Sequence, residues 1–201
     1  MKHLPPVSQY CGTGGRCATD WYIQAVSGGL GPLGVYQGFK ELFNMGLINR
    51  IPKLAIIQAA GCAPMVNAFK AGKDVAEAII PETSIIILST GDPGKMYTYL
   101  WKLTQQYGGV MESVTDAEAF AAMRALAKSE GMAVEPATAV AFAGLEMLIR
   151  NGIIRPDEKV VVNCTGHTFP VEKHVLGDQF AVDVHLSKDQ SAAPREGLQA
   201  A

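Results

Sequence analysis

The chain has 201 residues, of which 48% are hydrophobic and 18% are charged, and its formal net charge is −2. This composition predicts a globular protein with one substantial core, and it gives no reason to expect nucleic acid or an anionic membrane as a partner. No apolar run approaches the length of a membrane-spanning helix, and the first residues do not resemble a secretory signal, so we expect a cytoplasmic protein.

The four cysteines are Cys11, Cys17, Cys62 and Cys164. None of them forms a Cys-x-x-Cys pair, and no histidine lies at metal-ligand spacing from two of them. We therefore expect reduced thiols and no metal site.

Residues 1–19 contain glycine and proline without apolar periodicity, which predicts an irregular N-terminal segment. The apolar run 21–26 then predicts a buried strand, and a helix is predicted over 33–45. Between them, residues 27–32 read Ser-Gly-Gly-Leu-Gly-Pro. A strand, a glycine-rich loop and a helix in this order are typical of an anion site, because free N–H groups at a helix start point toward bound charge. Pro32 suits the first helical turn. We predict a phosphate site here.

Three interpretations of this loop remain open. Gly29-x-Gly31-x-x-Gly34 matches the dinucleotide-binding fingerprint, but that fingerprint also needs an acidic residue at the end of the next strand. The next predicted strand, 54–60, contains no Asp or Glu. A small phosphorylated cofactor needs only the loop, and a tight turn that binds no ligand needs neither.

The rest of the chain alternates between predicted strands and helices, which favours a parallel α/β sheet. Residues 20–187 are expected to form one domain, followed by a loose polar tail over 188–201. The turn 90–94 follows a predicted strand and is a candidate ligand loop. Further strands are predicted at 84–88, 110–114 and 159–163, and further helices at 64–69, 96–107, after the capping residues 115–118, and at 137–149.

Four segments taken together resemble the C-terminal half of the threonine synthases, which are fold-type-II pyridoxal-phosphate enzymes of the tryptophan synthase β-like group. The segments are Gln-Ala-Val-Ser-Gly-Gly-Leu-Gly-Pro-Leu-Gly-Val at 24–35, Gln-Ala-Ala-Gly-Cys-Ala-Pro-Met at 58–65, Val-Glu-Pro-Ala-Thr-Ala-Val at 134–140 and Val-Val-Asn-Cys-Thr-Gly-His at 161–167. The resemblance covers residues 20–184 and implies pyridoxal 5'-phosphate as the cofactor.

The resemblance also implies the roles of individual residues. The residues whose backbone is expected to hold the cofactor phosphate are Ser27, Gly28, Gly29, Leu30 and Gly31. The hydroxyl of Thr165 is expected to hydrogen-bond the pyridine nitrogen and, as a neutral partner, to keep that nitrogen largely unprotonated. Glu135 is expected at the start of a buried helix, either as an N-cap or as a group near the chemistry.

The sequence departs from the family where the nucleophile is expected. The family's Schiff-base lysine lies in its N-terminal half, in a Ser/Thr-Phe-Lys-Asp-type motif that this chain lacks. Phe39-Lys40-Glu41 is only superficially similar and lies in the helix after the phosphate loop, and Ala60 replaces a residue that is usually acidic. We therefore assign no catalytic residue to this chain, and we expect it to bind the cofactor weakly and not to turn over alone.

The reaction implied by the resemblance converts O-phosphohomoserine and water into threonine and phosphate. The implied partners are a small phosphorylated amino acid, a complementary N-terminal half and a second copy in a homodimer. Two alternatives stay open: a serine/threonine dehydratase or cysteine synthase of the same fold, and a non-catalytic domain that binds a phosphate ligand.

Overall fold

The computed structural model describes residues 18–168, nearly all of which belong to one compact unit that ends at Gly166. Its centre is a sheet of four parallel strands in the order β3-β2-β1-β4. The strands are β1 (Trp21–Ala25), β2 (Lys53–Ala59), β3 (Gly109–Val114) and β4 (Val160–Val162). The predicted α/β class with a parallel sheet is confirmed. The segment 1–17 and the tail 188–201 lie outside the described residues, so the predicted domain boundaries stay predictions.

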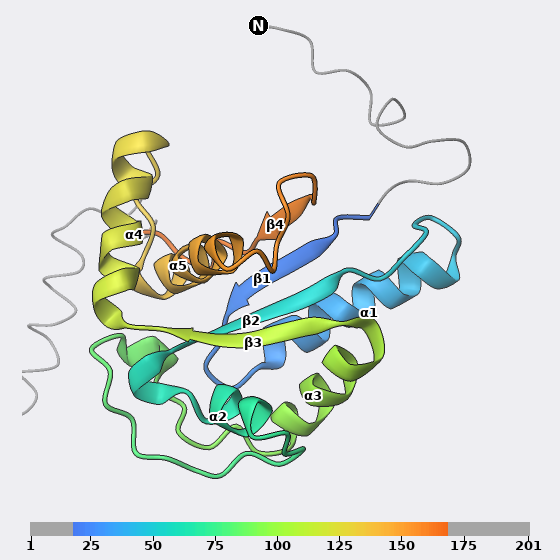
Figure 1. Ribbon diagram of the computed structural model, residues 1–201, viewed down its shortest axis with the longest axis horizontal. Helices are drawn as coiled ribbons and strands as arrows, with labels where there is room; N and C mark the ends of the chain where they lie inside the picture. Colours follow the sequence, from blue (N-terminus) through green and yellow to red (C-terminus); the bar gives the residue numbers. More distant parts are fainter. Residues whose placement is uncertain (1–17, 169–201) are drawn as a thin grey trace, which may run out of the picture. The chain divides into compact units, whose positions relative to one another are not determined.

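Helices cover both faces of the sheet (Figure 1). On one face lie α1 (Leu30–Asn44), α2 (Pro64–Lys70) and α3 (Lys95–Tyr107), and on the other lie α4 (Asp116–Ser129) and α5 (Pro136–Arg150). Two short 3-10 helices, η2 (Ala60–Cys62) and η3 (Ile86–Leu88), lie in the connections. No helix within residues 18–168 is long and apolar enough to cross a membrane.

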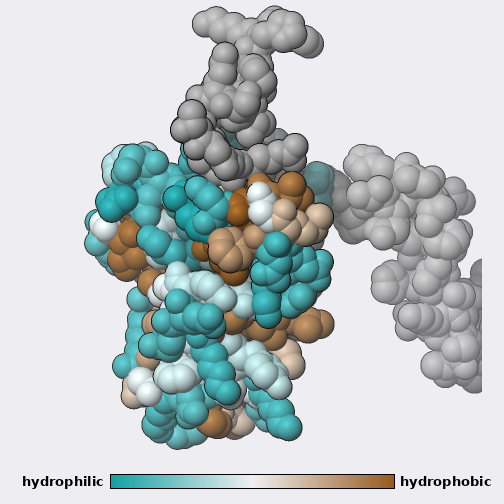
Figure 2. Space-filling view, turned by 90° about the vertical axis from the view of Figure 1, so that its right-hand side faces the viewer, coloured by the Kyte–Doolittle hydropathy of each residue, from teal (hydrophilic) through white to brown (hydrophobic). Residues whose placement is uncertain are grey.

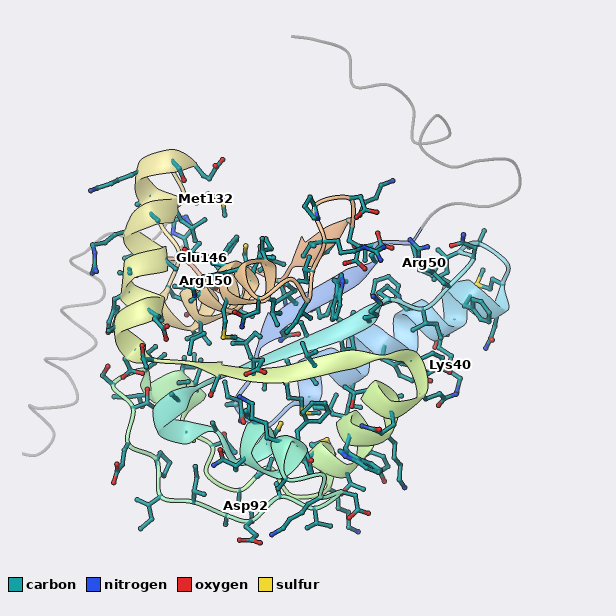
Figure 3. The ribbon with its side chains drawn as sticks, viewed as in Figure 1. Lys40, Arg50, Asp92, Met132, Glu146 and Arg150 are labelled. Atoms are coloured by element: carbon teal, nitrogen blue, oxygen red, sulfur yellow. The ribbon has the colours of Figure 1, made fainter. Side chains whose placement is uncertain are left out.

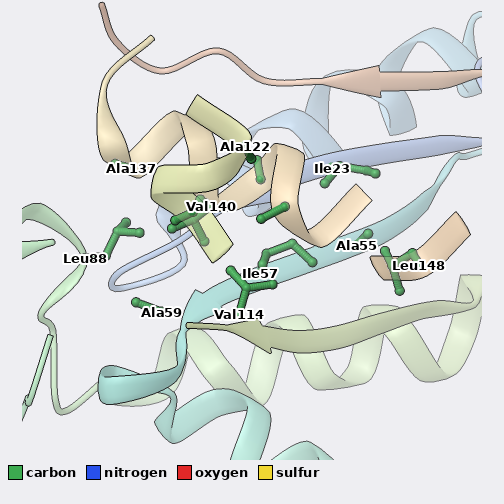
Figure 4. Packing of buried hydrophobic residues seen from close by; sticks show 14 of the residues in the cluster. Ile23, Ala55, Ile57, Ala59, Leu88, Val114, Ala122, Ala137, Val140 and Leu148 are labelled. Carbon is green, nitrogen blue, oxygen red and sulfur yellow. The ribbon is translucent and has the colours of Figure 1, made fainter. Parts of the chain in front are cut away.

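The strands are apolar on both faces because each face packs against helices. Alternate residues of β1 enter different cores: Ile23 packs with the cluster under α5, whereas Tyr22 packs with the cluster under α1 and α3. Figure 4 shows Ile57 of β2 and Val114 of β3 beside Val140 of α5. On the face seen in Figure 2, hydrophilic residues predominate and apolar residues gather in small groups.

Most predicted elements are found within a few residues of their expected bounds. The helix after the glycine loop begins at Leu30 rather than residue 33, with Pro32 in its first turn as predicted. The predicted capping residues also cap α4, since the Thr115 hydroxyl accepts a hydrogen bond from the Glu118 N–H at 3.2 Å and the Glu118 carboxylate accepts from the Thr115 N–H at 2.7 Å.

The predicted strand 84–88 is wrong. This segment contains η3 and adds no strand to the sheet. Ile85 and Leu88 are buried, but Ile86 and Ile87 between them are 80% and 64% exposed. Burial of two residues three positions apart is the pattern of a helical turn, which a short apolar run does not distinguish from a core strand. The turn 90–94 therefore follows η3 and not a strand.

The strand order places a topological switch point between β1 and β4. From β1 the chain adds β2 and then β3 on one side, and it then returns to add β4 on the other side of β1. The connections that leave the carboxyl ends of β1 and β4 therefore diverge, and open parallel sheets bind ligands in the crevice that this divergence leaves.

A buried carboxylate joins the segment before β4 to the centre of the sheet. Glu158, whose side chain is 7% exposed, accepts hydrogen bonds from the Arg155 N–H at 2.8 Å and from Lys53 Nζ at 3.0 Å. These two donors lower the pKa of Glu158 to about 2.

This depressed pKa predicts a pH-dependent stability. Because the folded-state pKa of Glu158 lies below its ordinary value near 4.5, its contribution is present above that value and is lost as the pH falls toward about 2. We expect the free energy of unfolding to fall over this range, and to fall less steeply in Glu158→Gln. Denaturant titrations at several pH values measure this slope. Glu77→Gln is the matched control: Lys73, at 2.6 Å, also lowers the pKa of Glu77, but this carboxylate is 80% exposed, so its replacement is expected to change the slope much less. Equal slopes for wild type and Glu158→Gln would contradict the prediction.

Candidate functional site

A cavity of about 440 Å³ lies at the switch point. Its lining comes from the end of β1 with the glycine loop, from η3 and the turn after it, from the start of α5, and from the connection after β4. The volume is within the usual range for small-molecule sites. The lining residues are Gln24, Ala25, Val26, Ser27, Gly28, Gly29, Leu30, Gly31, Ile87, Leu88, Thr90, Glu135, Ala137 and Thr165.

The glycine loop presents free backbone donors to this cavity. Gly29 is the N-cap of α1 and has φ +86°, a left-handed conformation that glycine adopts without steric cost. Within residues 18–168, no acceptor is found for the backbone N–H groups of residues 27–31. These donors, together with the positive end of the 15-residue helix α1, form an anion-binding arrangement.

Thr165 faces the loop from the other side of the switch point. Its hydroxyl donates a hydrogen bond to Glu135 Oε1 at 2.9 Å and lies 3.0 Å from the hydroxyl of Thr138. Thr138 is fully buried and accepts a hydrogen bond from the Gly166 N–H at 3.0 Å. The connection after β4 is thereby fastened to the first turn of α5, and this fixes the position of the Thr165 hydroxyl at the cavity.

Glu135 occupies the N-cap position of α5, as predicted, but its side chain makes no capping hydrogen bond. The carboxylate accepts the Thr165 hydroxyl instead, and the Glu135 N–H donates to the Gly166 carbonyl at 3.2 Å. N-capping by the carboxylate is therefore the wrong interpretation of this residue, and the alternative that places it among the cavity groups agrees with the contacts.

The structure brings all six predicted cofactor-binding residues to one cavity: Ser27, Gly28, Gly29, Leu30, Gly31 and Thr165. Their binding role stays a prediction. The described lining includes no lysine. Lys40 is an exposed residue of α1 and lies at the edge of the molecule (Figure 3).

The cavity also receives Thr90, from the predicted ligand loop 90–94, and Gln24, a glutamine to which the sequence assigned no role. Thr90 lines the cavity although the strand expected before it is absent. Gln24 is only 9% exposed within the apolar strand β1, and its Oε1 accepts a hydrogen bond from the Tyr22 hydroxyl at 2.9 Å. A glutamine inside an otherwise apolar strand was the available signal for this residue, because buried polar side chains need partners.

Neither described cysteine suggests chemistry at the cavity. Cys62 is buried and Cys164 is exposed, both are free, and burial raises the pKa of the Cys62 thiol. No group of His, Cys, Asp and Glu side chains that could hold a metal ion is found within residues 18–168.

Comparison with known proteins identifies the family. Residues 12–166 match the family described as "Pyridoxal-phosphate dependent enzyme". The chain belongs to this family. The cofactor of the pyridoxal-phosphate-dependent enzymes is the small phosphorylated ligand that the loop predicts, and the interpretation as a dinucleotide site is set aside.

Relatives of this chain include two threonine synthases. That of Methanocaldococcus jannaschii is 41% identical over 134 residues, which are 66% of this chain and 33% of that protein. That of Methanosarcina acetivorans is 42% identical over 137 residues, again 66% of this chain and 33% of that protein. A cysteate synthase of Methanospirillum hungatei is 32% identical over 157 residues, 73% of this chain and 37% of that protein. The chain spans about a third of the length of these curated relatives.

Solved structures of pyridoxal-phosphate-dependent enzymes share the fold. The L-serine ammonia-lyase of Rhizomucor miehei aligns with a TM-score of 0.60 and 22% identity, covering 82% of this chain and 50% of that one. The processed form of threonine deaminase isoform 2 from Solanum lycopersicum aligns with a TM-score of 0.59 and 19% identity, covering 81% of this chain and 44% of that one. The fold is the tryptophan synthase β-like fold of fold-type-II pyridoxal-phosphate enzymes, as predicted.

The residues present fit pyridoxal phosphate. The free N–H groups of residues 27–31 supply donors for a phosphate, and the Thr165 hydroxyl supplies a polar contact at the other side of the same cavity. The two sets of groups come from the two connections that diverge at the switch point.

Proposed function

We propose that this chain supplies the phosphate-binding part of a threonine-synthase-like enzyme, which converts O-phosphohomoserine and water into threonine and phosphate with pyridoxal 5'-phosphate. The observation that carries the proposal is the 41% and 42% identity to two threonine synthases. The free loop amides beside Thr165 support it. Within the proposal, residues 20–187 form the cofactor-binding domain.

When bound, pyridoxal phosphate supplies a ring that accepts electron density from the substrate. The chain's own groups bind and orient it. In the proposal, the N–H groups of residues 27–31 hold the phosphate, and backbone donors fixed by a helix start need no rearrangement when they bind it. The apolar residues Ile87 and Leu88 also line the cavity.

Thr165 has one hydroxyl hydrogen. The acceptor of this hydrogen determines whether Thr165 can donate a hydrogen bond to a ring nitrogen or only accept one from it. While this hydrogen is donated to Glu135 Oε1, the Thr165 oxygen can only accept from a protonated nitrogen. Donation to an unprotonated nitrogen, the role implied by the resemblance, requires that the hydroxyl leave Glu135. In the proposal Glu135 is therefore a positioning residue that acts through Thr165.

The reaction also needs an amine nucleophile and proton carrier, and the described cavity lining has no lysine. A second polypeptide segment is therefore proposed to bring a lysine to the cavity. The complete enzyme is proposed to be a homodimer and to lie in the cytoplasm. The charge balance and composition of the chain support a location in an aqueous compartment.

Ligand titration of the isolated chain tests the cofactor. Melting temperatures are measured with pyridoxal phosphate, with pyridoxal and with inorganic phosphate, since a ligand that binds only the folded state raises the melting temperature. We expect the largest rise with pyridoxal phosphate, a smaller rise with phosphate and little change with pyridoxal. Equal rises with pyridoxal phosphate and phosphate would favour the non-catalytic phosphate-binding alternative.

Two further measurements test the reaction. Borohydride reduction followed by peptide mass analysis is expected to find no cofactor on a lysine of this chain, and a modified lysine would contradict the need for a second segment. After addition of a lysine-bearing segment from a related threonine synthase, phosphate release from O-phosphohomoserine is expected. Turnover of serine instead would favour the second candidate, a dehydratase or cysteine synthase of the same fold. The 32% identity to a cysteate synthase is the observation that supports this candidate.

A further inference from the structure

The side chain of Gln24 lies beside the glycine loop and has an unused donor. Gln24 is nine-tenths buried in β1 and lines the cavity. Its Oε1 accepts a hydrogen bond, but no acceptor for its Nε2 is found within residues 18–168. A free amide N–H group at the cavity can donate a hydrogen bond to an acceptor that a bound ligand supplies.

Tyr22 fixes which end of the amide faces the cavity. Its hydroxyl donates to Gln24 Oε1 at 2.9 Å, two positions back along the same face of β1. Burial raises the pKa of Tyr22, so the phenol stays protonated and keeps its hydrogen for this bond. With Oε1 held in this way, Nε2 of the same planar amide is directed to the other side, toward the loop.

Gly31 leaves the space that Nε2 occupies. A Cβ atom built on Gly31 would overlap the amide of Gln24, with Nε2 the nearest atom. Gly31 is the second residue of α1, and its own N–H is one of the free donors of the loop. The glycine at this position therefore brings a side-chain donor from β1 next to the backbone donors at the start of α1.

We propose that the Gln24 amide is an additional phosphate ligand, which donates a hydrogen bond from Nε2 to the anion held by the loop and is oriented for this by Tyr22. The inference rests on the proposed function for the identity of the anion as a cofactor phosphate. It adds a side-chain donor whose replacement leaves the backbone of the loop unchanged, so the two contributions are separable.

Inorganic phosphate is the probe, and its dissociation constant is measured by the rise in melting temperature and by 31P NMR. Gln24→Glu keeps the size of the side chain and the acceptor for Tyr22 but replaces the donor by a carboxylate oxygen. We expect it to weaken phosphate binding by at least about 10- to 100-fold, because the anion loses a hydrogen bond and the new carboxylate also repels it. Tyr22→Phe is expected to weaken binding by less, because the amide stays but is no longer oriented.

Gln105→Glu is the matched control, since it makes the same change in charge at an exposed residue of α3 outside the cavity lining. Circular dichroism verifies that each variant folds, and Gln24→Met provides a neutral side chain without a donor. Wild-type affinity in both Gln24→Glu and Gln24→Met, or no phosphate binding by the wild type, would overturn the inference. If Gln24 variants lose phosphate binding while the pyridoxal ring adds no affinity, the inference stands and the proposed cofactor is wrong.

Discussion

Gly29→Ala is expected to destabilise the protein by about 3 kcal/mol and to abolish phosphate binding. Gly29 has φ +86°, and a Cβ atom there would lie 2.7 Å from Leu100 Cδ1 and 2.9 Å from Met65 Cε. Both of these side chains are fully buried, so they cannot move aside without loss of packing. Relief of the strain would turn the loop and its free amides away from their present directions.

Thermal and denaturant unfolding measure the first effect, with an expected fall in melting temperature of about 10 °C. Gly34→Ala is the matched control because Gly34 lies in α1, the helix that Gly29 precedes, and has no atom within 4 Å of a Cβ position. That change is expected to stabilise the helix by about 0.5–1 kcal/mol. A Gly29→Ala variant with wild-type stability and phosphate affinity would show that the left-handed loop is not required.

Gly144→Val is expected to destabilise the protein by about 3 kcal/mol through overpacking of the core. Gly144 lies where α5 approaches β2, and a Cβ atom there would lie 2.6–2.9 Å from three side-chain atoms of Ile57, which is fully buried. Chemical denaturation measures the loss. Gly38→Val, at an open position of α1, provides the control for adding the same side chain to a helix.

A double-mutant cycle tests the cause. Ile57→Ala removes the three atoms that the new side chain would meet, although it is itself expected to cost about 2–5 kcal/mol. In Gly144→Val/Ile57→Ala, the loss should be smaller than the sum of the single losses by about 0.5–3 kcal/mol. Additive losses would place the strain elsewhere than at Ile57.

The parts of the fold that local chemistry determines could be predicted from the sequence. Glycine and proline at 27–32 predict a turn and a helix start, and the structure has both. The capping residues before α4 are recognisable because both partners lie within four positions. The secondary structure of segment 84–88 could not be predicted. A short apolar run forms a core strand only if the sheet has a place for it, and here the sheet is formed by other strands and leaves Ile86 and Ile87 exposed.

In the cavity, too, some features follow from local sequence and others depend on long-range packing. The loop is one contiguous stretch, so its role as a phosphate site could be predicted from residue types alone. The contact between Glu135 and Thr165 joins residues 30 positions apart and depends on the packing of α5 against β1, the strand with which β4 pairs. The orientation of Gln24 depends on Tyr22 and on the empty position at Gly31, and neither follows from a periodicity.

The two halves of the cavity differ in how firmly the sheet holds them. The loop leaves β1, which is paired on both sides, whereas Thr165 follows β4, whose pairing within residues 18–168 is with β1 alone and over three residues. We expect local opening at β4 to separate the two halves while β1 and β2 stay paired. A ligand that contacts both halves holds them together. Its binding free energy adds to the free energy that is needed to separate β4 from β1. Hydrogen exchange should therefore slow at β4 on ligand binding and stay unchanged at β2.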